Sequence, residues 1–436
     1  MNKRSGLGVV AAALALALTA CSDPGADISA DTPVTWADPT SKLDGVELTI
    51  WAAQNSNTVP ESVVAGFEQA TGASVEVVTI PDPYEQGVQT KVATGDKPDL
   101  AFWQPTASML TAINAKTNLQ PLNGAPWLPQ LAPAVRDITG ILDHTRYAAL
   151  VTSPAVEGVY YNKEVFAAHG ITSTPKNFDE MVARARTLKA KGVTPFHEMA
   201  GDRWATQWWV QVQLADAAKD GLWEKINTGG ETFSGKPVLD AIRTYKSLID
   251  EGLFNADIKT AKFTDQGDAL LDGEAAMVVQ VNSFFGQLQA KVDTATLDRK
   301  IGFFPISPSG NVGTFIPDQS NALVAFKTGD AKRENAALQL LSYWMGPGYE
   351  KFVQDRKSVS LQPAVRNPPG VPQALLDVHA ALPTAVGSMQ ALAVANPDLY
   401  INLADMINGA MTPEQVAEAT QNQFEQLAKA AGVPGF

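Results

Sequence analysis

The stretch from Ala148 to Phe166 constrains the fold most, because the sequence pattern changes across it. Before it, short β-like segments alternate with helical ones, and after it long amphipathic helical patterns dominate. The stretch itself is apolar and rich in β-formers, with breaks at Ser153-Pro154 and Gly158. This pattern predicts a strand that leaves one lobe and enters another. A chain of 436 residues is also long for one core, which favours two lobes with a functional cleft between them.

The charge and the rare residue types exclude several function classes. The formal net charge is −13, so the field of the protein repels phosphate backbones, and we expect no nucleic-acid partner. The one cysteine, Cys21, excludes an intramolecular disulfide. The four histidines are not paired at ligand spacing, so no metal and no other cofactor is expected.

The N-terminal residues have the pattern of a targeting segment. Lys3 and Arg4 precede an apolar run from Leu7 to Leu18, which is shorter than the ~20 residues that span a bilayer. We therefore expect a signal peptide over residues 1–20. Its end resembles a bacterial lipoprotein lipobox, which implies cleavage before Cys21, lipidation of its thiol and anchoring on the extracytoplasmic face of a membrane. Residues 21–43 then form the lipidated cysteine and a disordered tether.

The N-terminal part predicts a βαβαβ order, with strands over 46–51, 74–80 and 99–103. Parallel strands of this kind bind ligands at their carboxyl ends. The loops there carry amide, hydroxyl, carboxylate and aromatic groups: Gln54, Asn55, Ser56, Asp82, Trp103 and Gln104. They contain no glycine-rich phosphate cradle, which favours a neutral polyhydroxylated ligand over a nucleotide. Ordinary turn chemistry explains any one loop alone, and Trp103 is as readily a core residue.

The second lobe offers an aromatic candidate site. Three tryptophans fall between Gly201 and Trp209, and Trp204 and Trp208 share a helical face. Aromatic faces suit sugar rings, so we predict that Trp204 and the nearby Gln207 contact a ligand; the alternative is a bulky core helix. A buried strand over 274–281 delivers Asn282 and Phe284 at its carboxyl end, which again suits a carbohydrate.

Several segments together resemble the extracellular solute-binding proteins of ABC importers, in the sugar-binding family that includes maltose-binding protein. They are FEQATGASVEVV, GDKPDLAFW, GVYYNKEVFAAHGI, TPKNFDEMVARARTLKAKGVTPF, GEAAMVVQVNSFF and IGFFPISPSG. The resemblance implies an α/β, two-lobed Venus-flytrap fold, each lobe a mainly parallel sheet flanked by helices, with several crossings. It assigns residues 44–153 and 301–357 to lobe 1, and residues 154–300 and 358–436 to lobe 2. The further crossings are then expected at Asp298–Gly302 and Lys357–Gln362.

The resemblance also adds candidate ligand contacts. Where many relatives open a strand with two glycines, this chain has Pro317-Asp318-Gln319-Ser320, so Asp318 and Gln319 become candidates. Gln362 falls where relatives place a polar segment facing the cleft. Tyr400 falls where maltose-binding protein has a stacking aromatic.

The implied function is a lipid-anchored, monomeric binding protein that captures a mono- or oligosaccharide and delivers it to ABC permease subunits. One alternative is a secreted glycoside hydrolase using two carboxylates from Asp82, Asp202 and Asp318. No GxSxG is present, and His197-Glu198 lacks the second histidine of HExxH, so we expect no enzyme. Another alternative is a different solute such as a peptide, polyamine or glycerol phosphate. A phosphate would want clustered arginines, and the predicted cleft loops offer only Arg203 and Arg366.

Overall fold

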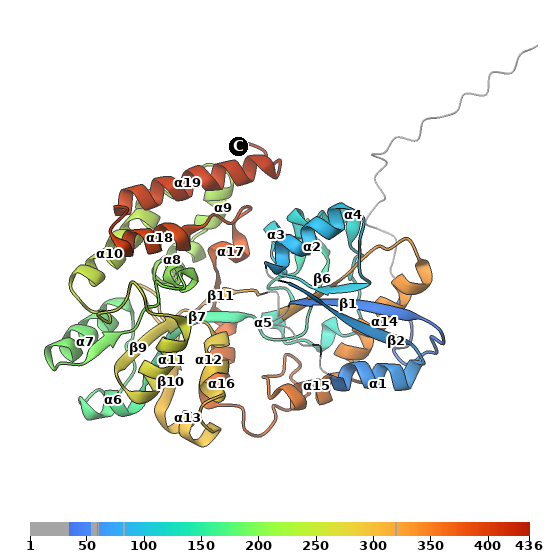
Figure 1. The fold of residues 1–436 in the computed structure, drawn as a ribbon, viewed down its shortest axis with the longest axis horizontal. Helices are drawn as coiled ribbons and strands as arrows, with labels where there is room; N and C mark the ends of the chain where they lie inside the picture. Colours follow the sequence, from blue (N-terminus) through green and yellow to red (C-terminus); the bar gives the residue numbers. More distant parts are fainter. Residues whose placement is uncertain (1–34, 54–58, 60, 82, 319–320) are drawn as a thin grey trace, which may run out of the picture. The chain divides into compact units, whose positions relative to one another are not determined.

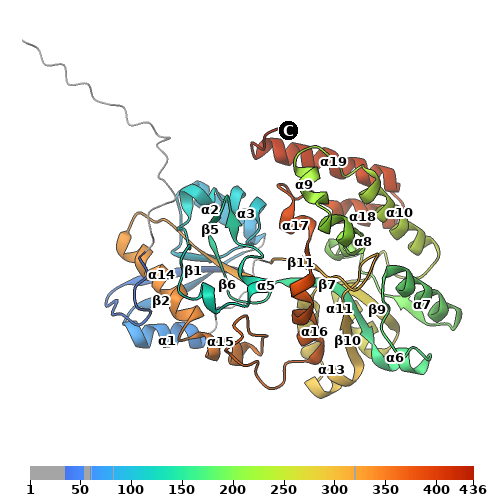
Figure 2. The ribbon, with the colours of Figure 1, turned by 180° about the vertical axis from the view of Figure 1, so that it is seen from behind.

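The computed structural model describes residues 35–53, 59, 61–81, 83–318 and 321–436. These residues form two lobes, each built around its own β-sheet with helices packed on it (Figure 1; seen from behind in Figure 2). The expected two-lobed α/β fold is therefore confirmed. None of the helices in the described part of the chain combines the length and apolar character needed to cross a bilayer.

The sheet of the first lobe has the strand order β2-β1-β3-β12-β6. Its strands are β1 (Glu47–Ala53), β2 (Ser74–Ile80), β3 (Leu100–Phe102), β6 (Ala148–Leu150) and β12 (Ala322–Ala325). Strands β2, β1 and β3 are parallel, as the βαβαβ pattern predicted. Strand β12 is antiparallel to both β3 and β6, so β2, β1, β3 and β6 all run in one direction, and the expected mainly parallel sheet is confirmed with one reversed strand. Strand β12 is reversed because it enters from the other lobe and not through a helical crossover.

Helices α2 and α3 appear on one side of this sheet in Figures 1 and 2, and α1, α14 and α15 appear on the other. The helices and single turns of the first lobe are α1 (Glu61–Thr71), α2 (Tyr84–Ala93), α3 (Ala107–Ala112), α4 (Ala115–Asn118), η1 (Leu128–Gln130), α5 (Pro133–Arg136), α14 (Ala331–Met345) and α15 (Tyr349–Arg356).

The sheet of the second lobe has the order β13-β11-β7-β9-β8, with β10 also paired to β7. Its strands are β7 (Ala155–Asn162), β8 (Thr194–Phe196), β9 (Ala275–Gln280), β10 (Ile301–Phe304), β11 (Thr314–Ile316) and β13 (Val386–Gly387). Strand β7 is antiparallel to β9, β10 and β11, and only the β8–β9 and β11–β13 pairs are parallel. Strands β8, β9, β10, β11 and β13 therefore run in one direction and only β7 opposes them, so the expected mainly parallel sheet is confirmed here too, with one reversed strand.

Helix α8 packs on β7, β9 and β11, while α16 packs on β7 and β10. The helices and single turns of the second lobe are α6 (Lys163–Ala168), α7 (Phe178–Ala190), η2 (Trp204–Gln207), α8 (Trp208–Lys219), α9 (Leu222–Asn227), α10 (Lys236–Asp250), α11 (Phe263–Asp272), η3 (Asn282–Phe284), α12 (Phe285–Gln289), α13 (Thr294–Lys300), α16 (Gln373–Ala381), η5 (Leu382–Thr384), α17 (Met389–Leu392), α18 (Leu399–Asn408) and α19 (Pro413–Ala430).

The stretch from Ala148 to Phe166 passes from one lobe to the other, as predicted. Strand β6 pairs with β12 in the first sheet, and β7 pairs within the second. The first crossing is therefore made by residues 151–154, which contain the predicted break at Ser153-Pro154.

The next crossing lies elsewhere than predicted. Strand β10 pairs with β7 from Ile301 opposite Asn162, and β11 pairs with β7 from Thr314 opposite Glu157. Residues 301–316 therefore belong to the second lobe, because the second edge of β7 is filled by these two strands in turn. The second crossing lies between Ile316 and Ala322, not at Asp298–Gly302.

The third crossing is also later than predicted. The carbonyl of Leu361 accepts a hydrogen bond from the Ala132 amide in the first lobe (2.9 Å), and its amide donates to the Tyr349 hydroxyl (2.7 Å). The chain therefore still lies on the first lobe at Leu361 and has reached the second by the start of α16 at Gln373, whereas Lys357–Gln362 was expected.

One asparagine ties the first two crossings together. The Asn321 amide nitrogen donates to the Thr152 hydroxyl (3.0 Å) and the Ser153 carbonyl (2.9 Å). Its side-chain oxygen accepts from the Asp318 amide (2.7 Å), and its own carbonyl accepts from the Val151 amide (2.8 Å). Because Asn321 is buried, these bonds fix the relative positions of the two segments.

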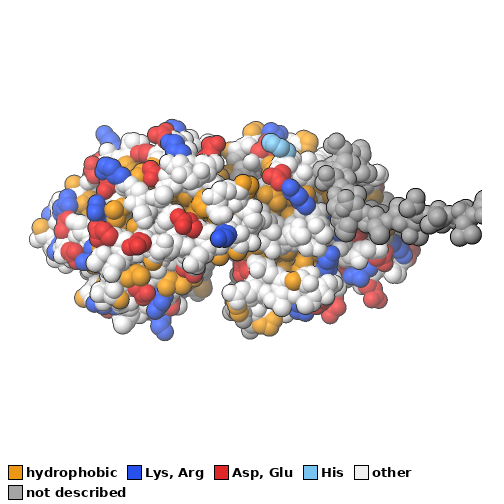
Figure 3. Space-filling view, turned by 90° about the horizontal axis from the view of Figure 1, so that it is seen from above, with side chains coloured by type: hydrophobic (Ala, Val, Ile, Leu, Met, Phe, Trp, Pro, Cys, Tyr) orange, Lys and Arg blue, Asp and Glu red, His pale blue; other side chains and the backbone are white. Residues whose placement is uncertain are grey.

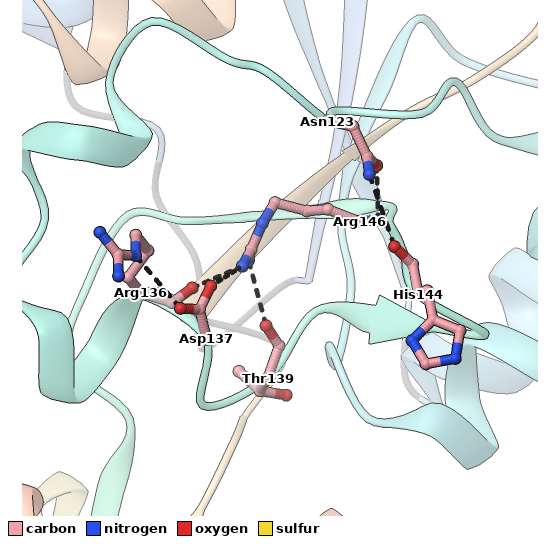
Figure 4. Close-up of polar contacts among 6 residues, drawn as sticks. All are labelled: Asn123, Arg136, Asp137, Thr139, His144 and Arg146. Atoms are coloured by element: carbon pink, nitrogen blue, oxygen red, sulfur yellow. Dashed lines mark hydrogen bonds and ion pairs between the residues drawn. The ribbon is translucent and has the colours of Figure 1, made fainter. Parts of the chain in front are cut away.

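A buried arginine fixes the approach to β6 (Figure 4). The Arg146 guanidinium donates to the carbonyls of Arg136 (2.5 Å) and Thr139 (3.2 Å) and to the Asp137 carboxylate (3.1 Å). Arg146 closes the hairpin of β4 (Ile141–Leu142) and β5 (Thr145–Arg146). Its backbone amide donates to Asn123 (2.8 Å), so the hairpin is held against the segment that precedes it.

A buried carboxyl makes the second lobe sensitive to pH. Glu198 accepts hydrogen bonds from the Met199 amide (2.7 Å) and the Tyr245 hydroxyl (3.0 Å) in a core of stacked aromatic rings. Burial, partly offset by these bonds, raises the pKa of Glu198 to about 7. The folded state therefore keeps its proton at pH values where the unfolded chain has lost it.

We predict that folding stability falls as pH rises from about 4.5 to about 7, the window between the unfolded and folded pKa values of Glu198. This single group accounts for about 3 kcal/mol across that window. Glu198→Gln should flatten the fall, as measured by urea unfolding at pH 5 and pH 8. An unchanged slope in the variant would contradict the assignment. Glu157, whose pKa burial also raises, remains in both proteins and leaves the difference between slopes intact.

We predict that Asn321→Ala lowers the free energy of unfolding by about 1–3 kcal/mol, because buried partners lose their hydrogen bonds. Hydrogen exchange at the Asp318 amide should also accelerate, since that amide loses its acceptor. The matched control is Asn227→Ala, which removes a comparable side-chain tie inside the second lobe, to Leu392 and Val394. Equal exchange at Asp318 in the two variants would show that Asn321 does not hold the crossings.

Candidate functional site at the crossing segments

A cavity of about 280 Å³ lies against the first two crossings. Its walls come from both lobes: the crossings themselves, the start of α12, the end of α15 and one face of α16. Hydroxyl and amide groups dominate the polar part of the lining, contributed by Thr152, Ser153, Asn282, Ser283, Gln289, Asn321 and Ser358. Such groups can donate and accept hydrogen bonds, so the cavity suits a ligand with many hydroxyls.

Two of the predicted contacts, Asn282 and Asp318, meet on this cavity although 36 positions separate them in the sequence. Asn282 is held in place because its side-chain oxygen accepts from the Val156 amide on β7 (2.9 Å). A third predicted contact, Gln104, reaches the second crossing from the end of β3, where its amide nitrogen donates to the Pro317 carbonyl (3.0 Å). These residues therefore converge on the crossings as expected of a cleft.

Trp204, Gln207 and Tyr400 form a second group on η2 and the start of α18. The Gln207 amide donates to the Trp204 carbonyl (3.0 Å), and the Thr206 hydroxyl donates to the Tyr400 carbonyl (3.0 Å). Trp204 and Tyr400 are both half-buried. Gln207 is buried, and its side-chain oxygen accepts a hydrogen bond from Gln390 (2.6 Å). This bond ties η2 to α17.

An aromatic path links this second group to the edge of the cavity. The Trp204 ring packs against Phe263 (5.1 Å between centroids), and Phe263 packs against Phe284 (6.1 Å). Phe284 ends the same short turn, η3, that begins with the cavity residue Asn282. Trp204 is therefore joined by packed rings to the turn that carries the cavity residue Asn282.

Three predicted contacts are core residues in this structure. Trp103 and Phe284 have no exposed surface, and Gln362 is 3% exposed. The Trp103 indole nitrogen donates to the Met109 carbonyl (3.0 Å), and the Gln362 amide donates to the Met345 carbonyl (2.6 Å). Because their polar groups are satisfied by backbone and their apolar surfaces are covered, we remove all three from the proposed contacts.

Six predicted residues lie outside the described part of the chain. They are Cys21, Gln54, Asn55, Ser56, Asp82 and Gln319.

Among the cavity residues that the sequence reasoning missed, three have basic side chains: Arg356, Lys357 and His379. Burial lowers the pKa of Arg356 and also that of His379. Arg356 and Lys357 lie at the end of α15, next to the crossing predicted at Lys357–Gln362. That position in the sequence is the signal that could have identified them. Nothing in the sequence around His379 marks it, because it comes to the cavity only through the packing of α16 against β7 and β10.

Acidic and basic side chains are interspersed over the face of the molecule seen in Figure 3, which carries no broad patch of one sign of charge.

The model of a family described as bacterial extracellular solute-binding protein matches residues 52–351, well over half of the chain. A curated relative, a binding protein of Brucella abortus, is 24% identical over 301 residues, and the match covers 67% of this chain and 66% of that protein. The chain thus spans just under two thirds of the length of that relative.

Solved structures share the fold. A chitin oligosaccharide binding protein is 21% identical with a TM-score of 0.70, over 88% of this chain and 99% of that one. An ABC transporter solute-binding protein from Thermotoga lettingae, bound with α-D-tagatose, is 18% identical with a TM-score of 0.68, over 88% and 99%. With the two lobes, the crossings and the cavity between them, the family match identifies the chain as a member of the bacterial extracellular solute-binding proteins.

Proposed function

We propose that this protein is a lipid-anchored, extracytoplasmic binding protein that captures a mono- or oligosaccharide between its lobes and delivers it to an ABC permease. The observation that carries the proposal is the cavity at the crossings, where hydroxyl and amide groups from both lobes meet. A ligand that contacts both lobes favours the arrangement in which the two lobes lie closer to each other. A permease can recognise that arrangement. Two proteins of similar structure, a chitin oligosaccharide binding protein and a solute-binding protein bound with α-D-tagatose, point to the same ligand class.

Binding without turnover is favoured over hydrolysis. Of the carboxylates considered for a hydrolase, Asp202 accepts a hydrogen bond from the Phe263 amide (2.7 Å), so it fixes the start of α11. Asp318 lies on the cavity, where a carboxylate also serves as an acceptor for sugar hydroxyls. The family match is to binding proteins.

Trp204 is proposed as the aromatic platform for a sugar ring. A thermal-shift panel of mono- and oligosaccharides on the purified protein should find at least one that raises the melting temperature, since a ligand at 100 times its Kd adds about 2.7 kcal/mol. Trp204→Ala should weaken that ligand about tenfold, or about 1.4 kcal/mol, and Trp204→Phe should weaken it less.

The control for Trp204 is Trp36→Ala, which removes another half-buried tryptophan, one that packs on Trp127 in the first lobe. That variant should keep full affinity. Equal affinity in Trp204→Ala and the unaltered protein would return Trp204 to a packing role. A panel in which no saccharide raises the melting temperature would count against the proposed function.

Lipidation at Cys21 has its own test. In a bacterial host grown with labelled palmitate, the full chain should take up label and sediment with membranes, whereas Cys21→Ser should remain unlabelled and leave the membrane fraction. Ser22→Ala, a change one position away, should stay anchored. Label in the Cys21→Ser variant would exclude this thiol as the anchor.

A further inference from the structure

The cavity at the crossings carries a positive wall inside an acidic protein. Two cations, Arg356 and Lys357, line it together with His379, against a single described carboxylate, Asp318. The whole chain has a formal net charge of −13, so this local excess of cations runs against the general charge. Cations placed in a concave site raise the local concentration of anions.

Arg356 combines access to solvent with a protein surround. The residue is exposed and lines the cavity at the end of α15, although neighbouring protein atoms lower its pKa by desolvation. Its guanidinium carbon lies 6.0 Å from the centre of the Phe352 ring, which orients the planar group. A guanidinium presents two parallel N–H donors that match a carboxylate.

Lys357 occupies a backbone conformation that favours glycine. Its φ is +47° at the end of α15, where the amides of Lys357 and Ser358 bond back to Gln354 (3.3 Å) and Val353 (3.3 Å). Glycine is the usual residue at such a helix end because it has no Cβ. A lysine there gives the cavity an ammonium group at the cost of backbone strain, and strain of this kind is typical of functional positions.

His379 supplies an unsatisfied nitrogen. Its Nδ1 is buried without a hydrogen-bond partner among the described residues. Burial lowers the pKa of His379, so near pH 7 the ring is neutral and offers a hydrogen bond in place of a charge. Buried polar atoms usually find a hydrogen-bond partner, so a small shift of the ring would let this nitrogen reach a ligand group or a water in the cavity.

We propose that the saccharide bound at the crossings is acidic, a uronic acid or an oligosaccharide that places a uronic acid unit in this cavity. The carboxylate lies between Arg356 and Lys357, and the ring hydroxyls face Ser153, Asn282 and Asp318. A volume of about 280 Å³ lies at the lower end of the range for small-molecule pockets, about 300 to 1,000 Å³, which suits one sugar unit. This inference rests on the proposed function and proposes an acidic ligand where the sequence favoured a neutral one.

The test titrates two series of sugars calorimetrically into the purified protein, and within each series the ligands differ only at carbon 6. The first series is glucose, glucuronate and glucose 6-phosphate, and the second is the corresponding galactose series. Short galacturonate oligomers are titrated as well. At least one uronate should bind ten or more times more tightly than its neutral parent. That advantage should shrink when salt rises from 50 to 300 mM, because ions screen the pair.

Two variants locate the effect. Arg356→Gln should weaken the uronate tenfold or more and leave the neutral parent unchanged. Lys357→Gly should also weaken the uronate, while its melting temperature stays equal or rises because glycine relieves the strained φ. Arg299→Gln, which removes a cation from the last turn of α13 outside the cavity, should leave affinity unchanged. If Arg356→Gln does not yield folded protein, Lys357→Gly decides alone.

The outcomes separate this inference from the proposed function. Neutral sugars that bind as tightly as uronates would overturn the acidic ligand and leave a saccharide-binding protein. Tighter binding of the sugar phosphate than of the uronate would overturn the assignment to a carboxylate. If neither neutral nor acidic sugars bind, both the acidic ligand and the proposed function are overturned.

Discussion

Strand β7 is the element on which the rest of the structure depends, because both of its edges are used and its N-terminal end is the first crossing. One edge pairs with β9, and the other pairs first with β11 and then with β10. At Gly158 a Cβ would lie 2.5 Å from the Phe303 ring and 3.0 Å from the Phe304 carbonyl, so a larger residue would push β10 away. The Asn321 bonds then join this strand's entry to the second crossing.

The sequence predicted the parts of this arrangement that depend on local pattern. The break at Ser153-Pro154 marked the first crossing, and the alternating βα pattern predicted the parallel half of the first sheet. It could not assign residues 301–316, because a buried strand such as IGFF has the same pattern whichever sheet it joins. The partner of β10 is decided by the free edge of β7, which is a property of the folded lobe.

The same distinction applies to the candidate site. Asn282 and Asp318 could be predicted because each follows or precedes a buried strand in a loop rich in polar groups. Trp103 could not be separated from the core, since the decisive fact is the Met109 carbonyl that satisfies its indole. In the sequence alone, Arg356 and Lys357 have the pattern of ordinary cations at a helix end. Only the packing of α15 in the folded first lobe brings them to the cavity that Asp318 also lines, so the positive character of the cavity is visible in the structure alone.

The central claim is that a saccharide binds where the crossings meet. The most direct test is hydrogen exchange across the chain with and without the saccharide that raises the melting temperature most. The account predicts slower exchange at residues 151–155, at Asp318 and Asn321, and through η3 into α12, with little change in β2 or α19, which lie away from the crossings. Protection confined to elements that do not line the cavity, with the crossings unchanged, would contradict it.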